Sequence, residues 1–123
     1  MKATMFFVFL LTSLAACSQQ PAYHNVDNKK FSELMKQPDV VILDVRTPQE
    51  FQGGHIPNAL LIDYNSGYFA DQVEKLDRDK TYLVYCAVGG RSSKASQILT
   101  DKGFKNVYNL QNGFSKWDGE VAK

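Results

Sequence analysis

A cysteine at the head of a glycine-rich loop is the side chain in this sequence best placed to do chemistry. Cys86 opens the segment Cys-Ala-Val-Gly-Gly-Arg, and a helical pattern follows. Small residues let successive backbone N–H groups turn inward and form an anion-binding concavity, toward which the following helix directs its positive end. Because such surroundings stabilise a thiolate, we expect Cys86 to have a lowered pKa and to act as a nucleophile. A strand-to-helix turn around a buried, inert cysteine is the alternative.

The remainder of the loop is the predicted substrate-binding site, in which backbone N–H groups and one guanidinium face an anionic group. Its residues are Ala87, Val88, Gly89, Gly90 and Arg91. No metal is expected, because the two histidines and two cysteines of the chain are far apart and lack C-x-x-C or H-x-x-x-H spacing. A thiolate held by N–H groups needs no organic cofactor either.

Alternating apolar patterns predict the elements that position this loop. Apolar runs of strand type occupy residues 40–43, 59–62, 81–85 and 107–110, and helical patterns occupy residues 27–35, 68–76, 92–102 and 114–117. Strand–helix alternation with short connections predicts a three-layer α/β/α fold around a parallel sheet. Ligands of such sheets bind beyond the carboxyl ends of the strands, and Cys86 stands there, directly after the run 81–85.

The composition indicates an ordinary globular domain and argues against nucleic-acid binding. The chain has 123 residues, of which 44% are hydrophobic and 22% charged, as in ordinary globular domains. Its 14 basic and 13 acidic side chains nearly balance, and no run of five Lys or Arg occurs, so nucleic-acid binding is not expected. The length fits one domain, assigned to residues 23–123, which we expect to act as a monomer on small molecules.

The N-terminal segment has the three-part order of a secretory signal peptide: Lys2, the apolar run 6–11, and a group of small residues. The small residues form the sequence Leu-Ala-Ala-Cys, which ends at Cys17 and resembles the bacterial lipobox. This resemblance implies that residues 1–16 are removed, that Cys17 carries lipid, and that residues 17–22 are a polar tether. An ordinary signal peptide with a chance cysteine beside it is the alternative.

Lipidation of Cys17 would leave Cys86 as an unpaired thiol and would also set the location of the protein. We expect an exported, lipid-anchored protein that faces the periplasm and touches the membrane only through its anchor. Ser18 after the lipidated cysteine favours the outer membrane, or the outer face of the cell membrane where no outer membrane exists. His24 is interpreted as part of the tether region and has no expected role.

From the tether onward, the chain resembles the rhodanese-like family of sulfurtransferases over nearly its whole length. Gly-His-Ile-Pro-Asn-Ala at residues 54–59 is similar to the family's GHIPGA signature. The other matching motifs are Asp-Val-Arg at 44–46, Glu-Phe at 50–51, the cysteine loop at 86–91, Asn-Gly-Phe at 112–114, and Trp117.

The resemblance implies a five-stranded parallel sheet with the cysteine strand in its interior. It also implies that Cys86 cycles between thiolate and persulfide, taking sulfane sulfur from thiosulfate or a persulfide donor and giving it to cyanide or a thiol. Two departures are visible. Many thiosulfate-using relatives have Arg where this chain has Ala87, and the family's first Gly before the closing helix is Asn112 here.

Several motif residues have expected structural roles. Asp44 and Arg46 follow a strand, and we expect them to support the cysteine loop and to pair with Glu50. Residues 47–50 form a capping box that should start a short helix. His55 is expected to hydrogen-bond within its own turn. Phe114 and Trp117 are expected to close the core.

Two other functions remain as alternatives. A phosphatase or arsenate reductase of the cell-cycle-phosphatase type would share the fold, but those enzymes resemble Cys-x5-Arg, whereas Cys86 and Arg91 form Cys-x4-Arg. The other alternative is a non-catalytic binding module, although inactive relatives typically lack the cysteine that this chain has.

Overall fold

The structure is a computed structural model, and it describes residues 23–123. The expected signal peptide, Cys17 and the tether therefore lie outside the described residues. Its strands are β1 (His24–Val26), β2 (Val40–Asp44), β3 (Leu60–Leu61), β4 (Thr81–Tyr85) and β5 (Asn106–Leu110). Its helices are α1 (Asn28–Leu34), α2 (Pro48–Gly53), α3 (Phe69–Val73) and α4 (Gly90–Asp101), with the 3₁₀ helices η1 (Tyr64–Ser66) and η2 (Phe114–Lys116).

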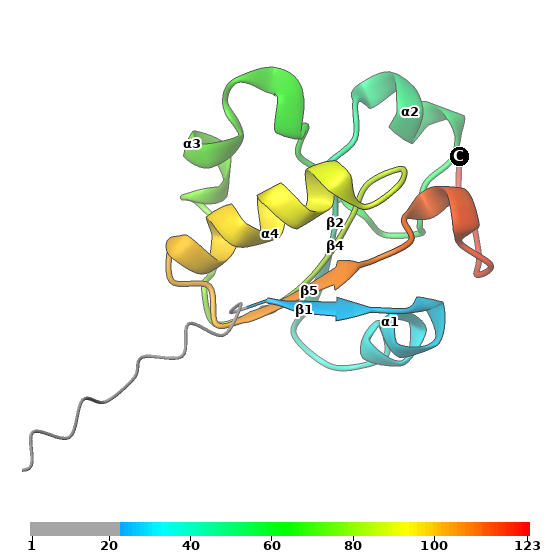
Figure 1. Cartoon of the computed structure of the whole chain (residues 1–123), viewed down its shortest axis with the longest axis horizontal. Coiled ribbons are helices and arrows are strands. Elements are labelled where there is room, and N and C mark those ends of the chain that lie inside the picture. Colours follow the sequence, from blue (N-terminus) through cyan, green and yellow to red (C-terminus); the bar gives the residue numbers. More distant parts are fainter. Residues whose placement is uncertain (1–22) are drawn as a thin grey trace, which may run out of the picture.

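All five strands join one parallel sheet in the order β1-β5-β4-β2-β3, which confirms the predicted α/β class (Figure 1). β4 is the central strand, paired in register with β2 on one side and β5 on the other. It is almost wholly buried, as its apolar, β-branched and aromatic composition requires. The strand that delivers the cysteine is therefore the most enclosed strand of the sheet.

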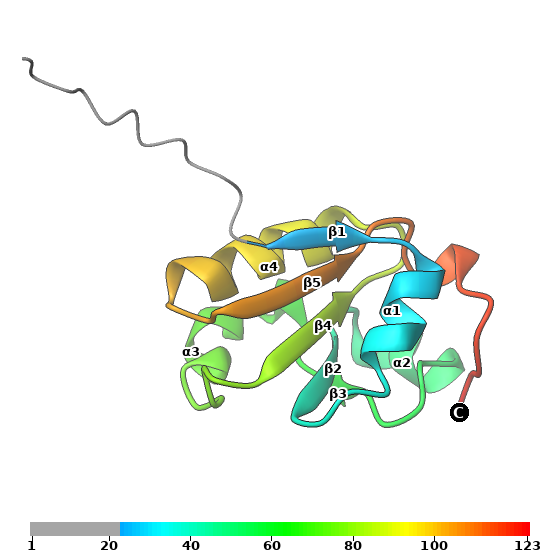
Figure 2. The same cartoon turned by 90° about the horizontal axis from the view of Figure 1, so that it is seen from below.

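Helices cover both faces of the sheet and complete the three layers (Figures 1 and 2). On one face, α3 and α4 pack Val73, Ala95 and Leu99 against Val84 and other strand residues. On the other face, α1 and the C-terminal segment pack Phe31 and Trp117 around Leu83 and Tyr85. The sheet is thus enclosed between two apolar cores.

Strand β1 is absent from the sequence prediction, which places His24 in the tether. The structure corrects this: His24 lies in β1, pairs in register with Tyr108 of β5, and its ring lies 5.1 Å from the Tyr108 ring. Two of the three β1 residues are exposed, and only Val26 is buried. A strand this short and polar shows no apolar periodicity in the sequence. It forms because it pairs with β5, which lies far along the chain.

The other elements differ from prediction mainly in their ends. β3 contains only two residues, and α3 ends at Val73 rather than continuing to residue 76. α4 begins at Gly90, two residues before the expected start. The starts of α1 and α2 follow the predicted caps, since Asp27 accepts the Lys30 N–H and the full capping box forms before α2. Within residues 23–123, no helix has the length and apolar character needed to cross a bilayer.

Candidate active site

Cys86 lies immediately after β4, at the carboxyl end of the sheet, and is fully buried. Backbone N–H groups of Gly89 and Ser92 point at its Sγ atom from 3.1 and 3.3 Å. The thiol donates to Ser92 Oγ at 3.2 Å, and that hydroxyl donates in turn to the Gly89 carbonyl at 3.2 Å. Once the thiol is ionised, the hydroxyl is free to donate to the sulfur instead.

The balance of burial and hydrogen bonding lowers the pKa of Cys86. Burial raises this pKa, but the hydrogen bonds from the Ser92 hydroxyl and from the N–H groups of Ser92, Val88 and Gly89 outweigh it. The lowered pKa agrees in direction with the sequence expectation. Ser92 is a contributor that the sequence prediction missed, because there it marks only the start of a helix.

Two glycines let the loop pack against the turn that follows β5. Gly89 has φ of +101°, and a Cβ atom there would lie 2.4 Å from the Gln111 carbonyl oxygen. Gly113 has φ of +72°, and its Cβ would lie 2.3 Å from the Ala87 carbonyl oxygen. Both positions demand glycine on two counts, backbone conformation and space. The Asn112-Gly113 motif is therefore part of the site, because it supports the loop from behind.

Hydrogen bonds fix this contact between the loop and the turn. The N–H of Phe114 donates to the Cys86 carbonyl at 2.8 Å, and the N–H of Ser115 donates to the Ala87 carbonyl at 3.0 Å. With their carbonyls held by η2, the peptide units at the start of the loop are fixed in orientation. This positions the following N–H groups toward the sulfur.

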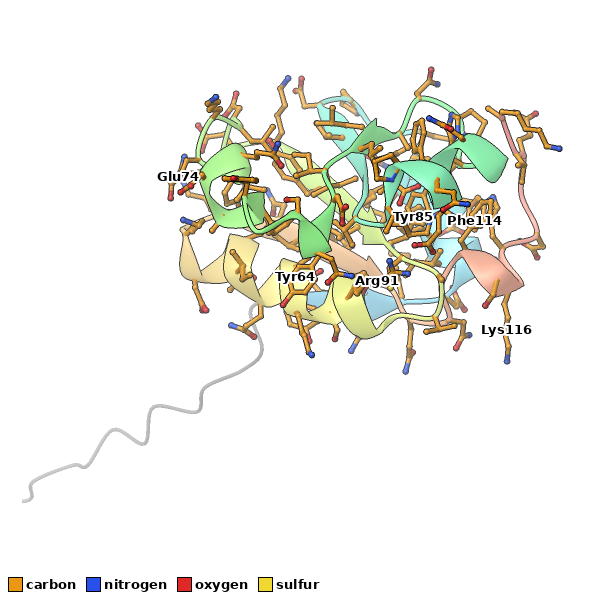
Figure 3. All side chains as sticks on the ribbon, turned by 90° about the horizontal axis from the view of Figure 1, so that it is seen from above. Tyr64, Glu74, Tyr85, Arg91, Phe114 and Lys116 are labelled. Carbon is orange, nitrogen blue, oxygen red and sulfur yellow. The ribbon has the colours of Figure 1, made fainter. Side chains whose placement is uncertain are left out.

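Arg91 forms a bidentate ion pair with Glu50, with Nη1–Oε1 and Nη2–Oε2 distances of 2.8 and 3.0 Å. Glu50 also accepts the N–H and hydroxyl of Thr47 at the start of α2, at 3.3 and 3.2 Å. The hydrogen bonds and charge of Arg91, together with the hydrogen bonds from Thr47, outweigh the opposing effect of burial and lower the pKa of Glu50 to about 2. The pair joins the first turn of α4 (Figure 3) to the capping box of α2.

The predicted pairing of Asp44 and Arg46 with Glu50 is wrong. Arg46 pairs with Asp44 itself, through Nε at 3.1 Å from both carboxylate oxygens and Nη2 at 2.7 Å from one of them. The same Nη2 donates to the Gly54 carbonyl at 2.7 Å. Both side chains are buried, so the nearest charge compensates each of them, while Glu50 faces α4 at the surface.

Tyr85 connects this buried pair to the rest of the site. Its hydroxyl donates to Asp44 at 2.7 Å and accepts the Ile56 N–H at 3.0 Å, and burial and the Asp44 carboxylate raise its pKa. Tyr85 and Phe114 lie side by side (Figure 3), with the Arg46 guanidinium 4.3 Å from the Phe114 ring centre. The Asp44–Arg46 pair therefore supports the loop indirectly, because Arg46 packs on the ring of Phe114 and Phe114 belongs to η2, which holds the loop carbonyls.

The remaining motif residues have structural positions, although His55 bonds to helix α2 rather than within its own turn. His55 Nδ1 lies 2.9 Å from the Phe51 carbonyl, and the two rings stack 3.7 Å apart. Trp117 packs edge-on against Phe31, with ring centres 5.6 Å apart. Neither side chain is hydrogen-bonded to the cysteine loop.

Two cavities, of about 370 and 340 Å³, lie along α1 and the amino end of β2, and Met35 and Ile42 line both. The cysteine loop lines neither. Its outer surface is instead marked by Val88, which is 72% exposed. Among residues 23–123, no group of three or more His, Cys, Asp or Glu side chains is arranged to hold a metal ion.

Comparisons with known proteins agree with this geometry. The family model of the rhodanese-like domain matches residues 27–120. The thiosulfate sulfurtransferase GlpE of Coxiella burnetii is 38% identical over 95 residues, which is 77% of this chain and 87% of that protein. The corresponding protein of Pseudomonas putida is 39% identical over 69% of this chain and 76% of its own.

Solved structures give the same result. A rhodanese-related protein from Thermoplasma volcanium is 30% identical, with a TM-score of 0.72 over 81% of this chain and 98% of that one. A rhodanese-like domain protein from Staphylococcus aureus is 30% identical, with a TM-score of 0.68 over 79% and 93%. Sequence relatives named as sulfurtransferases favour that activity over the phosphatase alternative. The chain belongs to the rhodanese-like domain family and is a sulfurtransferase of the rhodanese type.

Proposed function

We propose that this sulfurtransferase carries sulfur as a persulfide on Cys86. The observation that carries the proposal is the set of donors around Sγ, in which the N–H groups of Gly89 and Ser92 lie within 3.3 Å of a buried sulfur. The same donors that lower the thiol pKa would stabilise the anionic terminal sulfur of a persulfide. Nucleophilic attack and storage of the intermediate would therefore use one group of backbone donors.

The transfer takes two steps in which sulfur moves without net oxidation or reduction. The Cys86 thiolate attacks the sulfane sulfur of thiosulfate, the new S–S bond forms, and the old one breaks with its electron pair leaving on sulfite. Cyanide or a thiolate then attacks the terminal sulfur of the persulfide, and the Cys86 thiolate leaves with the electron pair. Thiosulfate is included as a donor because related sulfurtransferases bear its name.

We further propose that the enzyme works outside the cytoplasm as a lipid-anchored monomer. Support comes from the charged start, the apolar run 6–11 and the Leu-Ala-Ala-Cys sequence that ends at Cys17. All elements of the described fold lie after this segment, so the anchor and the catalytic domain would be separate parts of the chain. The sulfur donor and the acceptor would then be periplasmic small molecules.

The persulfide can be tested by mass measurement of the protein treated with thiosulfate. Tryptic cleavage after Lys80 and Arg91 would isolate residues 81–91, which contain Cys86 alone among the cysteines. We expect this peptide to gain the mass of one sulfur atom and to lose it on addition of cyanide. A Cys86→Ser variant should fold, since serine is nearly isosteric, but should neither gain sulfur nor turn over.

A Cys17→Ser variant is the matched control, because it removes the second cysteine of the chain, which lies outside the described domain. It should keep both the mass gain and the turnover. Sustained turnover by the Cys86→Ser variant would contradict the persulfide mechanism.

A further inference from the structure

The positive charge of the loop is already compensated by a neighbouring carboxylate. Arg91 gives both terminal nitrogens to Glu50, and Glu50 is held in that position by two further hydrogen bonds from Thr47. The Glu50 hydrogen bond and, at longer range, the Cys86 thiolate and Asp63 raise the pKa of Arg91. Arg91 therefore lies within electrostatic range of the reacting sulfur, while its charge is already paired with Glu50.

Neither Arg46 nor the other side chains of the loop 86–91 offer an unpaired positive charge to an anionic donor. The buried Arg46 is paired with Asp44 and also donates to the Gly54 carbonyl. At the outer surface of the loop, Val88 is 72% exposed and Ala87 is half-buried. A donor approaching Cys86 thus meets oriented N–H groups, a neutral ion pair and apolar side chains.

We propose that Glu50 is a specificity-determining residue, which by pairing with Arg91 biases the enzyme toward monoanionic organic sulfane donors and against dianionic thiosulfate. A thiosulfonate or an organic persulfide of one negative charge is the donor class that fits. The inference rests on the proposed persulfide function and adds the donor preference. Backbone N–H groups can hold the single charge of such a donor, and its organic group can lie against Val88 and Ala87.

Methanethiosulfonate and thiosulfate form a matched pair of donors for this question. In both, the Cys86 thiolate attacks the terminal sulfur and the S–S bond breaks. Methanesulfinate leaves with the electron pair in one case and sulfite in the other. The donors differ by one negative charge and by a methyl group in place of an oxygen. The ratio of their kcat/KM values therefore reports how the site responds to charge.

The test is steady-state kinetics of the full-length protein with both donors and cyanide as acceptor. Glu50→Gln keeps the size of the side chain and an oxygen for Thr47, but it leaves the charge of Arg91 uncompensated. We expect the ratio of kcat/KM for thiosulfate to that for methanethiosulfonate to rise about 2- to 10-fold. The rise should shrink as ionic strength increases, because a charge at the surface is screened.

Two further variants separate charge from shape. In Glu50→Gln/Arg91→Gln the pair is neutral again, and the donor ratio should return to the wild-type value even if both rates fall. Glu74→Gln removes the same charge from a carboxylate that pairs with Lys102 and Arg78, far from Arg91 toward the other end of α4 (Figure 3). Its donor ratio should not change.

Equal changes with both donors in Glu50→Gln, at every ionic strength, would overturn the inference and leave Glu50 as a support for the loop. That result would leave the persulfide proposal unaffected, because the mass of the Cys86 peptide tests that proposal separately. A donor ratio that rises in Glu74→Gln as much as in Glu50→Gln would also overturn it, because net charge rather than the Glu50–Arg91 pair would then be responsible.

Discussion

At the scale of single residues, the reactivity of this site depends on a competition around one sulfur atom. Burial of Cys86 opposes ionisation, and four hydrogen bonds involving Ser92, Val88 and Gly89 favour it. Three of these donors are backbone N–H groups, which substitution cannot remove directly. The Ser92 hydroxyl is the one side-chain contributor, so it offers a direct way to shift the balance.

Ser92→Ala should raise the pKa of Cys86. Loss of a hydrogen bond to a charged group corresponds to about one to two pKa units. The thiolate fraction at neutral pH would fall, so the pH midpoint of alkylation by iodoacetamide should move upward. Ser93→Ala is the control, because Ser93 Oγ contacts the Tyr23 hydroxyl at 3.1 Å rather than the thiol. An unchanged midpoint in Ser92→Ala would mean that the backbone donors alone set the pKa.

At the scale of elements, the loop is held by packing of the turn after β5 against its peptide units. Gly113 leaves room for the Ala87 carbonyl, and the N–H groups of Phe114 and Ser115 hold the first two carbonyls of the loop. The contact joins segments whose sequence positions differ widely. The orientation of the donors around Cys86 is therefore a property of two loops together.

Gly113→Ala should impair both the stability and the activity of the protein. Alanine at a positive φ costs at least about 1 kcal/mol, and the 2.3 Å approach to the Ala87 carbonyl would also force the backbone apart. Displacement of the loop by about 1 Å would reduce sulfurtransfer on the order of 100-fold. Urea denaturation and steady-state kinetics measure the two effects.

Gly53→Ala is the matched control for this substitution. A Cβ at Gly53 would meet no atom within 4 Å. It should leave sulfurtransfer near the wild-type rate. Normal activity in Gly113→Ala would show that the loop keeps its shape without this contact.

The sequence predicts a feature of the fold or the site when residues close together in the chain determine it. The cysteine loop, the caps of α1 and α2, and the buried central strand follow from neighbouring residues, so the sequence predicts them. The Glu50–Arg91 pair joins side chains 41 positions apart, and the role of Gly113 depends on a carbonyl in another loop. Strand β1 exists only through its pairing with β5. Such contacts arise from the folded arrangement, which no local pattern contains.

At the scale of the whole molecule, the anchor and the catalytic domain are expected to be independent. Cys17→Ser should move the protein from the membrane fraction to the soluble fraction. A single acyl chain binds a membrane only marginally, whereas two or more chains hold it firmly, so the separation should be clean. Sulfurtransfer should persist, because Cys86 and its supporting residues all lie within residues 23–123. Wild-type protein found soluble after export would exclude the lipid anchor.

The pairing of β1 with β5 has a consequence for the time at which this protein can fold. Asn25 and Asn109, which hydrogen-bond between the two strands, are 84 positions apart, and every strand pair of the described sheet is parallel. Parallel strands cannot pair as local hairpins. β5 must therefore leave the ribosome before β1 can join the sheet. The five-stranded sheet therefore cannot be complete until β5 has left the ribosome, whichever of the earlier strands have paired by then.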